Sequence, residues 1–172
     1  MKKIILLGYM ASGKTTMAEL LSKKSKINTV DLDKLIEKTE NLSINEIFNT
    51  KGELYFRKLE NQILQETIKS DENLIISLGG GTPCYYNNHE LLNNENIISI
   101  YLKASVNTLY ERLLTEKLKR PILFDKDEEE LKEFIAKHLF ERNFYYNQAK
   151  YTVIIDDRNS DEIVSEIHTL IK

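Results

Sequence analysis

The glycine-rich stretch Gly8-Tyr9-Met10-Ala11-Ser12-Gly13-Lys14-Thr15 constrains the fold of this chain more than any other feature. It matches G-x-x-x-x-G-K-[ST], the pattern of a phosphate-binding loop. An apolar-rich run over residues 2–7 precedes it and predicts a strand, while residues 14–24 follow it with a helical pattern. Such a loop wraps backbone N–H groups around phosphate at a helix N-terminus. The stretch therefore predicts a nucleotide-binding α/β fold.

The polar side chains of this loop have separate expected roles. Lys14 should reach the outer phosphates of a nucleotide, and the Thr15 hydroxyl should bind Mg²⁺. The alternative, a glycine-rich turn with no ligand, does not explain why a lysine follows the second glycine. We expect the nucleotide to contact Gly8, Ala11, Ser12, Gly13, Lys14, Thr15 and Thr16.

Two acidic residues follow the next predicted strand. Residues 27–30 read as a short strand, and Asp31-Leu32-Asp33 comes directly after it. Ligands of open α/β sheets bind at the carboxyl ends of strands. Side chains two positions apart on a strand point the same way. We expect one carboxylate near Mg²⁺ and the other on a substrate hydroxyl; the alternative is that one of them caps the following helix.

A helix predicted over residues 53–70 carries an arginine between two glutamates. Arg57 lies four residues after Glu53 and three before Glu60, which are spacings that bring side chains together on a helix. One interpretation is a surface ion pair of little energetic value. The other is a guanidinium that Glu60 orients toward an anionic substrate. Spacing alone favours the surface pair.

Three consecutive glycines, Gly79, Gly80 and Gly81, follow a predicted strand over residues 73–78. A glycine run costs backbone entropy, so it is expected where a ligand or another group approaches the main chain closely. Ser77, a polar residue in an otherwise apolar strand, could face the water shell of Mg²⁺. A flexible turn is the alternative.

The remaining pattern completes an α/β fold. Predicted strands at residues 97–102 and 151–155 alternate with helices at 106–113 and 127–148. The basic segment 114–126, which contains Arg120-Pro121, predicts a mobile lid over a nucleotide, with a solvated loop as the alternative. We therefore predict a single three-layer α/β/α domain over residues 1–172, with five strands in a doubly wound parallel sheet.

The composition limits the partners that the chain should have. A net charge of −3 and a pI near 5.7 give no indication of a nucleic-acid or membrane-surface partner. The chain has a single cysteine, Cys84, which suits a reducing compartment. Residues 2–7 are too short for the apolar core of a secretory signal, and no apolar run approaches the ~20 residues of a membrane span. We expect a cytoplasmic protein.

Taken together, these motifs resemble those of shikimate kinase over essentially the whole chain. The family has seven motifs in this order, and here they are the phosphate-binding loop, D-x-D at 31–33, F-R-x-x-E at 56–60, the triple glycine, R-P at 120–121, R-x-x-x-Y at 142–146, and Arg158. The resemblance implies transfer of the ATP γ-phosphoryl group to the 3-hydroxyl of shikimate with Mg²⁺. It also implies a monomer with the nucleoside-monophosphate-kinase fold and strand order 2-3-1-4-5.

The resemblance further implies roles for individual residues. A helical region near residues 33–61 would bind shikimate, with Asp33 on the acceptor hydroxyl as orienter or base. The catalytic residues would be Lys14, Asp33 and Arg120. Shikimate would also be bound by Arg57, Gly79, Gly80, Gly81 and Arg142. Thr15 and Asp31 would hold Mg²⁺ or its waters, and Arg112 and Arg158 would lie along the adenine.

The chain departs from the family pattern at a few positions. Ala11 replaces a usual glycine of the loop; because alanine is small and can adopt helical angles, we expect nucleotide binding to survive this change. Phe144 and Ser160 stand where prolines are common. Rival functions are another small-molecule kinase, such as a gluconate or nucleoside-monophosphate kinase, and a non-catalytic binding module. A GTPase switch is a poorer fit because the N-K-x-D motif is missing from the sequence.

Overall fold

The computed structural model describes residues 2–116 and 127–172. Its five strands form one parallel sheet in the order β2-β3-β1-β4-β5, as predicted. The elements are β1 (Lys3–Leu7), α1 (Lys14–Ser25), β2 (Asn28–Asp31), α2 (Leu32–Glu40), α3 (Ile44–Lys69), β3 (Leu74–Ser77), η1 (Thr82–Cys84), η2 (Asn88–Asn93), β4 (Ile97–Lys103), α4 (Val106–Glu116), α5 (Glu128–Tyr146), β5 (Tyr151–Ile154) and α6 (Ser160–Leu170).

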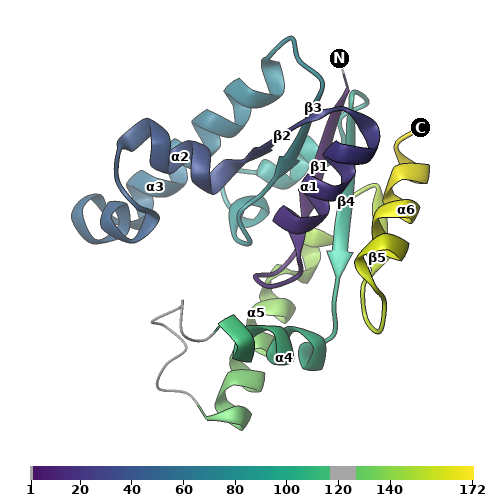
Figure 1. Ribbon diagram of the computed structural model, residues 1–172. Helices are drawn as coiled ribbons and strands as arrows, with labels where there is room; N and C mark the ends of the chain where they lie inside the picture. Colours follow the sequence, from purple (N-terminus) through teal and green to yellow (C-terminus); the bar gives the residue numbers. More distant parts are fainter. Residues whose placement is uncertain (1, 117–126) are drawn as a thin grey trace.

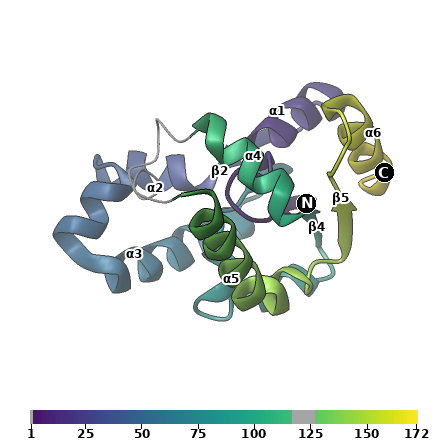
Figure 2. The same cartoon turned by 90° about the horizontal axis from the view of Figure 1, so that it is seen from below.

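The central strand β1 is buried along its whole length. Ile4 pairs with Ile75 of β3 on one side and with Ile98 of β4 on the other. A continuous apolar run is typical of a parallel strand with both faces covered. Figure 2 shows the covering layers, with α1 and α6 on one side of the sheet and α3 and α5 on the other.

All strands run in the same direction, so their carboxyl ends meet at one edge of the sheet. In Figure 1 this edge points toward α4 and α5, while the two chain termini lie at the opposite end. Leu7, Asp31 and Ser77 are the last residues of three adjacent strands. The segments that follow these residues are therefore brought together, as the sequence predicts.

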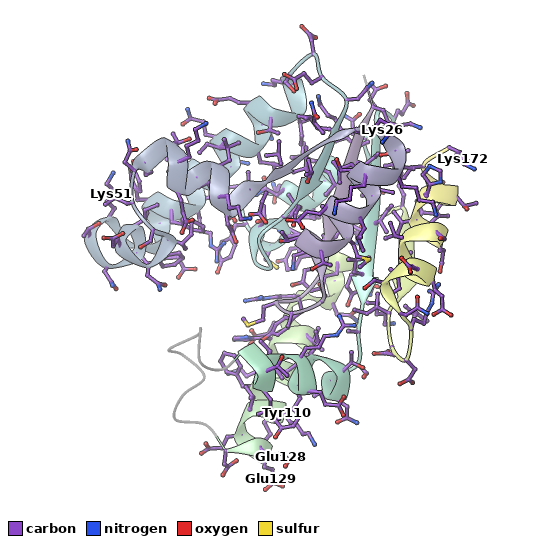
Figure 3. The ribbon with its side chains drawn as sticks, in the orientation of Figure 1. Lys26, Lys51, Tyr110, Glu128, Glu129 and Lys172 are labelled. Carbon is purple, nitrogen blue, oxygen red and sulfur yellow. The ribbon has the colours of Figure 1, made fainter. Side chains whose placement is uncertain are left out.

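The helices α2 and α3 extend sideways from the sheet beside β2 (Figure 1), and Figure 3 shows Lys51 at the outer end of the pair. Ser43 caps α3 through a capping box with Glu46. The helix is interrupted at Gly52, whose φ of 82° and ψ of 166° are not helical. The helix predicted from residue 53 therefore begins directly after this interruption.

Some predicted boundaries differ from those of the structure. Strand β2 covers residues 28–31 rather than 27–30, and α4 continues to Glu116, three residues beyond its predicted end. Arg120 and residues 117–126 of the predicted lid lie outside the described residues. Within the described ranges, no helix combines the length and the apolar character that crossing a membrane requires.

Candidate active site

A cavity of about 410 Å³ lies at the carboxyl edge of the sheet. Residues from five separate segments of the chain line it, and most of them are predicted site residues. Its lining includes Ala11, Gly13, Lys14, Thr15, Thr16, Asp31, Asp33, Arg57, Glu60, Ser77, Gly79, Gly80, Gly81 and Arg142. One cavity therefore contains the phosphate-binding loop, three carboxylates and two arginines.

The loop between β1 and α1 has a backbone that favours glycine. Gly8 has a φ of 148°, and a Cβ there would lie 2.7 Å from the carbonyl oxygen of Leu102. Gly13, the residue before α1, has a φ of 88°. Both positions therefore require glycine, because a side chain would be strained at either and would clash at Gly8.

Ala11 has a φ of 61°, in the left-handed region. It does not take the right-handed helical angles that alanine readily adopts. An L-residue in this region is disfavoured by roughly 1–2 kcal/mol, because its Cβ approaches the following carbonyl oxygen. Alanine thus keeps the conformation that a glycine would take at this position of the loop, at a cost in backbone strain.

The N-terminus of α1 is uncapped by any side chain. By contrast, a side chain accepts a hydrogen bond from the first turn of α2, α3, α5 and α6. The first turn of α1 also contains no acidic residue. Its backbone N–H groups and positive dipole end are thus suited to an anion such as phosphate.

Lys14, Thr15 and Asp31 lie on the loop side of the cavity. The Lys14 ammonium donates to the carbonyl oxygens of Gly8 and Tyr9, at 3.0 and 2.9 Å. The Thr15 hydroxyl donates to Asp31 Oδ2 at 2.8 Å. The other oxygen, Oδ1, accepts from the backbone N–H of Lys34 and caps α2. Asp31 therefore combines the two interpretations of the sequence, cap and site residue.

Asp33 lies in the first turn of α2 and faces the same cavity. It joins Asp31 there because the chain turns into a helix, and not through alternation along a strand as predicted. Burial, followed by the charges of Glu60 and Asp31, raises the pKa of Asp33 to about 6, against the opposing effect of Lys14 and Arg57. Such a carboxylate is a better proton acceptor than an exposed aspartate.

Arg57 is held by a buried partner. Its Nη1 donates to Glu60 Oε2 at 2.9 Å, and the Glu60 side chain is only 1% exposed. The interpretation as a surface ion pair is therefore wrong. Glu60 Oε1 accepts from the Thr82 hydroxyl at 2.6 Å, so both carboxylate oxygens are satisfied and the arginine has a fixed anchor.

Each glycine of the triple glycine lies against a different polar side chain. A Cβ on Gly79 would lie 2.9 Å from Asp33 Oδ1, and a Cβ on Gly81 would lie 2.8 Å from Arg57 Nη2. A Cβ on Gly80 would be 3.5 Å from Arg142 Nη1. The flexible-turn alternative does not explain these close approaches, which place the backbone directly beside the charged groups.

Arg142 enters the cavity from α5, and its Cζ lies 5.4 Å from the centre of the Tyr9 ring. Four residues later, Tyr146 is fully buried and its hydroxyl donates to the Gly80 carbonyl at 2.6 Å. The Tyr9 hydroxyl lies 3.0 Å from His138 Nδ1, also on α5. Helix α5 is thereby joined to both the phosphate-binding loop and the triple glycine.

A second cavity of about 270 Å³ lies beside the outer surface of the loop. Arg112 and Ser160 line it, and Arg112 Nη1 donates to the Ala11 carbonyl at 3.3 Å. Arg158 instead forms an ion pair with Glu166 at 2.6 Å and is absent from the lining of both cavities. The structure thus brings Arg112, and not Arg158, to the phosphate-binding loop.

Thr82, Tyr146 and Tyr9 were not among the predicted site residues, and Glu60 was predicted only as a possible orienting group for Arg57. The Arg57–Glu60 spacing and the position of Tyr146 in the R-x-x-x-Y motif were available signals. The contacts of Thr82 and Tyr9 join residues 22 and 129 positions apart. Local spacing provides no signal for contacts of this kind.

Comparisons with known proteins identify the relatives of this chain. A family model described as shikimate kinase matches residues 10–172. A shikimate kinase of Flavobacterium johnsoniae is 59% identical over 167 residues, which cover 97% of each chain. A shikimate kinase of Flavobacterium psychrophilum is 54% identical over 171 residues, which cover 99% of each chain.

Solved structures give the same result. The crystal structure of shikimate kinase from Bacteroides thetaiotaomicron has a TM-score of 0.90 at 36% identity, covering 98% of this chain and 97% of that chain. Shikimate kinase from Acinetobacter baumannii in complex with shikimate has a TM-score of 0.86 at 28% identity, covering 99% and 93%. A gluconokinase from Sinorhizobium meliloti, at 14% identity and a TM-score of 0.62, shares the fold alone. This chain belongs to the shikimate kinase family.

Proposed function

We propose that the two sides of the main cavity have separate roles in the phosphorylation of shikimate by ATP. Residues on one side bind the nucleotide, and residues on the other side bind shikimate. The observation that carries this proposal is the position of Asp33, which shares one cavity with the phosphate-binding loop and the two arginines and feels the charges of both Lys14 and Arg57. In phosphoryl transfer, positioning and charge neutralisation contribute more than covalent catalysis. An arrangement with cations on both sides of one carboxylate suits these needs.

On the nucleotide side, the free N–H groups at the start of α1 would bind the phosphates, and Lys14 would neutralise their charge. The purine would lie near Arg112, whose cavity adjoins the outer surface of the loop. Arg120, outside the described residues, would stabilise the transferring phosphoryl group, as the resemblance implies. Arg158 would take part in adenine binding only if its ion pair with Glu166 opened.

Thr15 and Asp31 fit a Mg²⁺ ion that also binds phosphate. Their oxygens lie 2.8 Å apart at the loop side of the cavity, and Mg²⁺ is usually held by one or two protein oxygens together with substrate phosphates and water. When bound, the ion would neutralise charge that develops on the phosphate oxygens. Ser77, at the end of β3, lines the same cavity and could contact its water shell.

On the acceptor side, Arg57 and Arg142 would bind the shikimate carboxylate, and the backbone of the triple glycine would lie beneath the ring. The Asp33 carboxylate would accept a hydrogen bond from the 3-hydroxyl. As the hydroxyl oxygen forms its bond to the γ-phosphorus, the bond from that phosphorus to the bridging oxygen of ADP breaks, and the hydroxyl proton passes to Asp33. The raised pKa of Asp33 supports this role.

We also propose a single kinase domain, with residues 33–61 as the acceptor-binding region and 114–126 as the lid, acting as a cytoplasmic monomer. The position of Asp33, Arg57 and Glu60 on α2 and α3 supports the acceptor-binding region.

The test of the proposed function is ADP release measured with shikimate, gluconate and AMP in parallel reactions. We expect turnover with shikimate and background rates with the other two acceptors. Turnover with AMP or gluconate and none with shikimate would overturn the assignment.

A further inference from the structure

The guanidinium of Arg57 is fixed along two of its edges by carboxylates. Nη1 donates to Glu60 at 2.9 Å and Nε donates to Glu53 Oε1 at 3.4 Å. Nη2 makes no hydrogen bond to another described residue and lies beside Gly81. The Nη2 side of the guanidinium therefore remains available to a ligand.

Tyr85 covers a face of the same guanidinium. The Cζ of Arg57 lies 4.2 Å from the centre of the Tyr85 ring, closer than to the rings of Phe56, at 5.0 Å, or Phe48, at 5.9 Å. An arginine over an aromatic face at this distance is attracted by the negative charge of the ring face. Tyr85 is therefore the nearest of the aromatic groups around Arg57.

Tyr85, Arg57 and Glu53 all contact one another, and the Tyr85 hydroxyl makes the contact with Glu53. It donates to Glu53 Oε1 at 3.0 Å, the same oxygen that accepts from Arg57 Nε. Burial and the hydrogen bond to Glu53 raise the pKa of the Tyr85 phenol, so it keeps its proton and remains a donor. Tyr85 thus contacts Arg57 through its ring and holds the glutamate that orients Arg57.

Tyr85 lies on the far side of Arg57 from the main cavity. A separate hollow of about 320 Å³ is lined by Glu53, Leu54, Arg57, Tyr85 and Tyr86. Arg57 lines this hollow and the main cavity, whereas Tyr85 is absent from the described lining of the main cavity. Arg57 is therefore the residue through which Tyr85 is expected to affect a ligand in the main cavity.

We propose that Tyr85 is a positioning residue that holds the guanidinium plane of Arg57 in the orientation required by the carboxylate of the acceptor substrate. A planar fork binds a carboxylate well only in its own plane, so a ring that fixes the plane lowers the cost of ordering the side chain on binding. The inference rests on the proposed role of Arg57 in binding that carboxylate.

The test compares Tyr85→Leu with Tyr85→Phe in steady-state kinetics. Tyr85 is 38% exposed, so we expect Tyr85→Leu to raise KM for shikimate by up to about 5-fold, the upper end of the effect of a cation–π contact at an exposed site. The Phe variant, which keeps the ring, should raise it no more than about 2-fold. Both variants should leave kcat and KM for ATP nearly unchanged. Tyr86→Leu, which alters the neighbouring aromatic side chain of the same hollow, is the matched control and should behave as the parent protein.

Arg57→Ala and the double variant Arg57→Ala/Tyr85→Leu separate the two hypotheses. If Arg57→Ala leaves KM for shikimate unchanged, the proposed role of Arg57 itself fails. If Arg57→Ala raises that KM and Tyr85→Leu does not, the positioning role is wrong. It is also wrong if Tyr85→Leu has the same effect with and without Arg57, or raises both substrate KM values equally. The expected result is that the effect of Tyr85→Leu disappears once Arg57 is removed.

Discussion

Replacing Asp33 with asparagine should stabilise the folded protein while abolishing turnover. The structure gives the reason, because burial and the charges of Glu60 and Asp31 raise the pKa of Asp33 from 3.8 to about 6. A group with a raised pKa favours the folded state while it is protonated, and this contribution is lost as the pH rises through the folded-state pKa. At neutral pH the Asp33 carboxylate therefore opposes folding.

The size of this effect follows from the two pKa values. A difference of about 2 pKa units corresponds to about 3 kcal/mol when the carboxylate is fully ionised. Asp33 lies in the first turn of α2, where the helix dipole favours a negative charge by roughly 0.3–1 kcal/mol. We therefore expect Asp33→Asn to raise the free energy of unfolding by roughly 2–3 kcal/mol at pH 8. The gain should fall to about 0.5 kcal/mol at pH 4.

The measurement is urea-induced unfolding of the parent and the Asp33→Asn variant at intervals from pH 4 to pH 8, without ligands. Asp71→Asn is a suitable control, because Asp71 is an exposed residue of the bend after α3. The control should show no gain that grows with pH. Activity and ATP binding are measured on the same samples.

Two results would contradict this reasoning. If Asp33→Asn were no more stable than the parent at pH 8, or if its gain did not change with pH, the carboxylate would not be destabilised by its surroundings. If the variant kept near-parental turnover, Asp33 would be neither base nor orienter. The combination of higher stability and lost activity is the expected signature of a charge retained for catalysis.

Other predictions concern the same cavity. Arg57→Ala should weaken shikimate binding by roughly 10- to 100-fold, because it removes a charge-assisted contact; equal losses for shikimate and ATP in titrations would indicate a structural role instead. Gly79→Ala should lower kcat by about 10- to 100-fold with ATP affinity retained, because its Cβ would lie 2.9 Å from Asp33 Oδ1; an unchanged kcat would show that the site tolerates the displacement. In the parent protein, kcat/KM for shikimate should fall below a pH of about 6 as Asp33 takes up a proton, and a profile that stays flat to pH 5 would contradict the assignment.

The parallel sheet and the position of the site were predictable because they depend on simple patterns, whereas the strand order came from the family resemblance. A phosphate-binding loop after an apolar strand fixes where α1 begins, and polar residues after three strands meet at one edge of a parallel sheet. Asp31 and Ser77 were each predicted to lie toward a Mg²⁺ ion, and both line the main cavity. The family resemblance was needed to choose between interpretations of Arg57.

The energetic character of individual residues was not predictable in the same way. Spacing shows that Arg57 and Glu60 can meet, but it does not show that Glu60 is buried. Burial depends on η1, because Thr82 supplies the second partner of the carboxylate. The same reasoning applies to Tyr146, whose contact with the Gly80 carbonyl spans 66 residues.

Ala11 shows how a local rule can fail for a physical reason. Alanine favours right-handed helical angles when nothing else acts on it. At position 11 the surrounding contacts decide instead, because Arg112 binds the Ala11 carbonyl and Ser12 N–H donates to the Tyr9 carbonyl. These bonds fix the direction of the loop, and the residue adopts a φ of 61° despite the strain. The path of the loop is therefore determined by the glycines and hydrogen bonds around Ala11, which is why a residue other than glycine can occupy it.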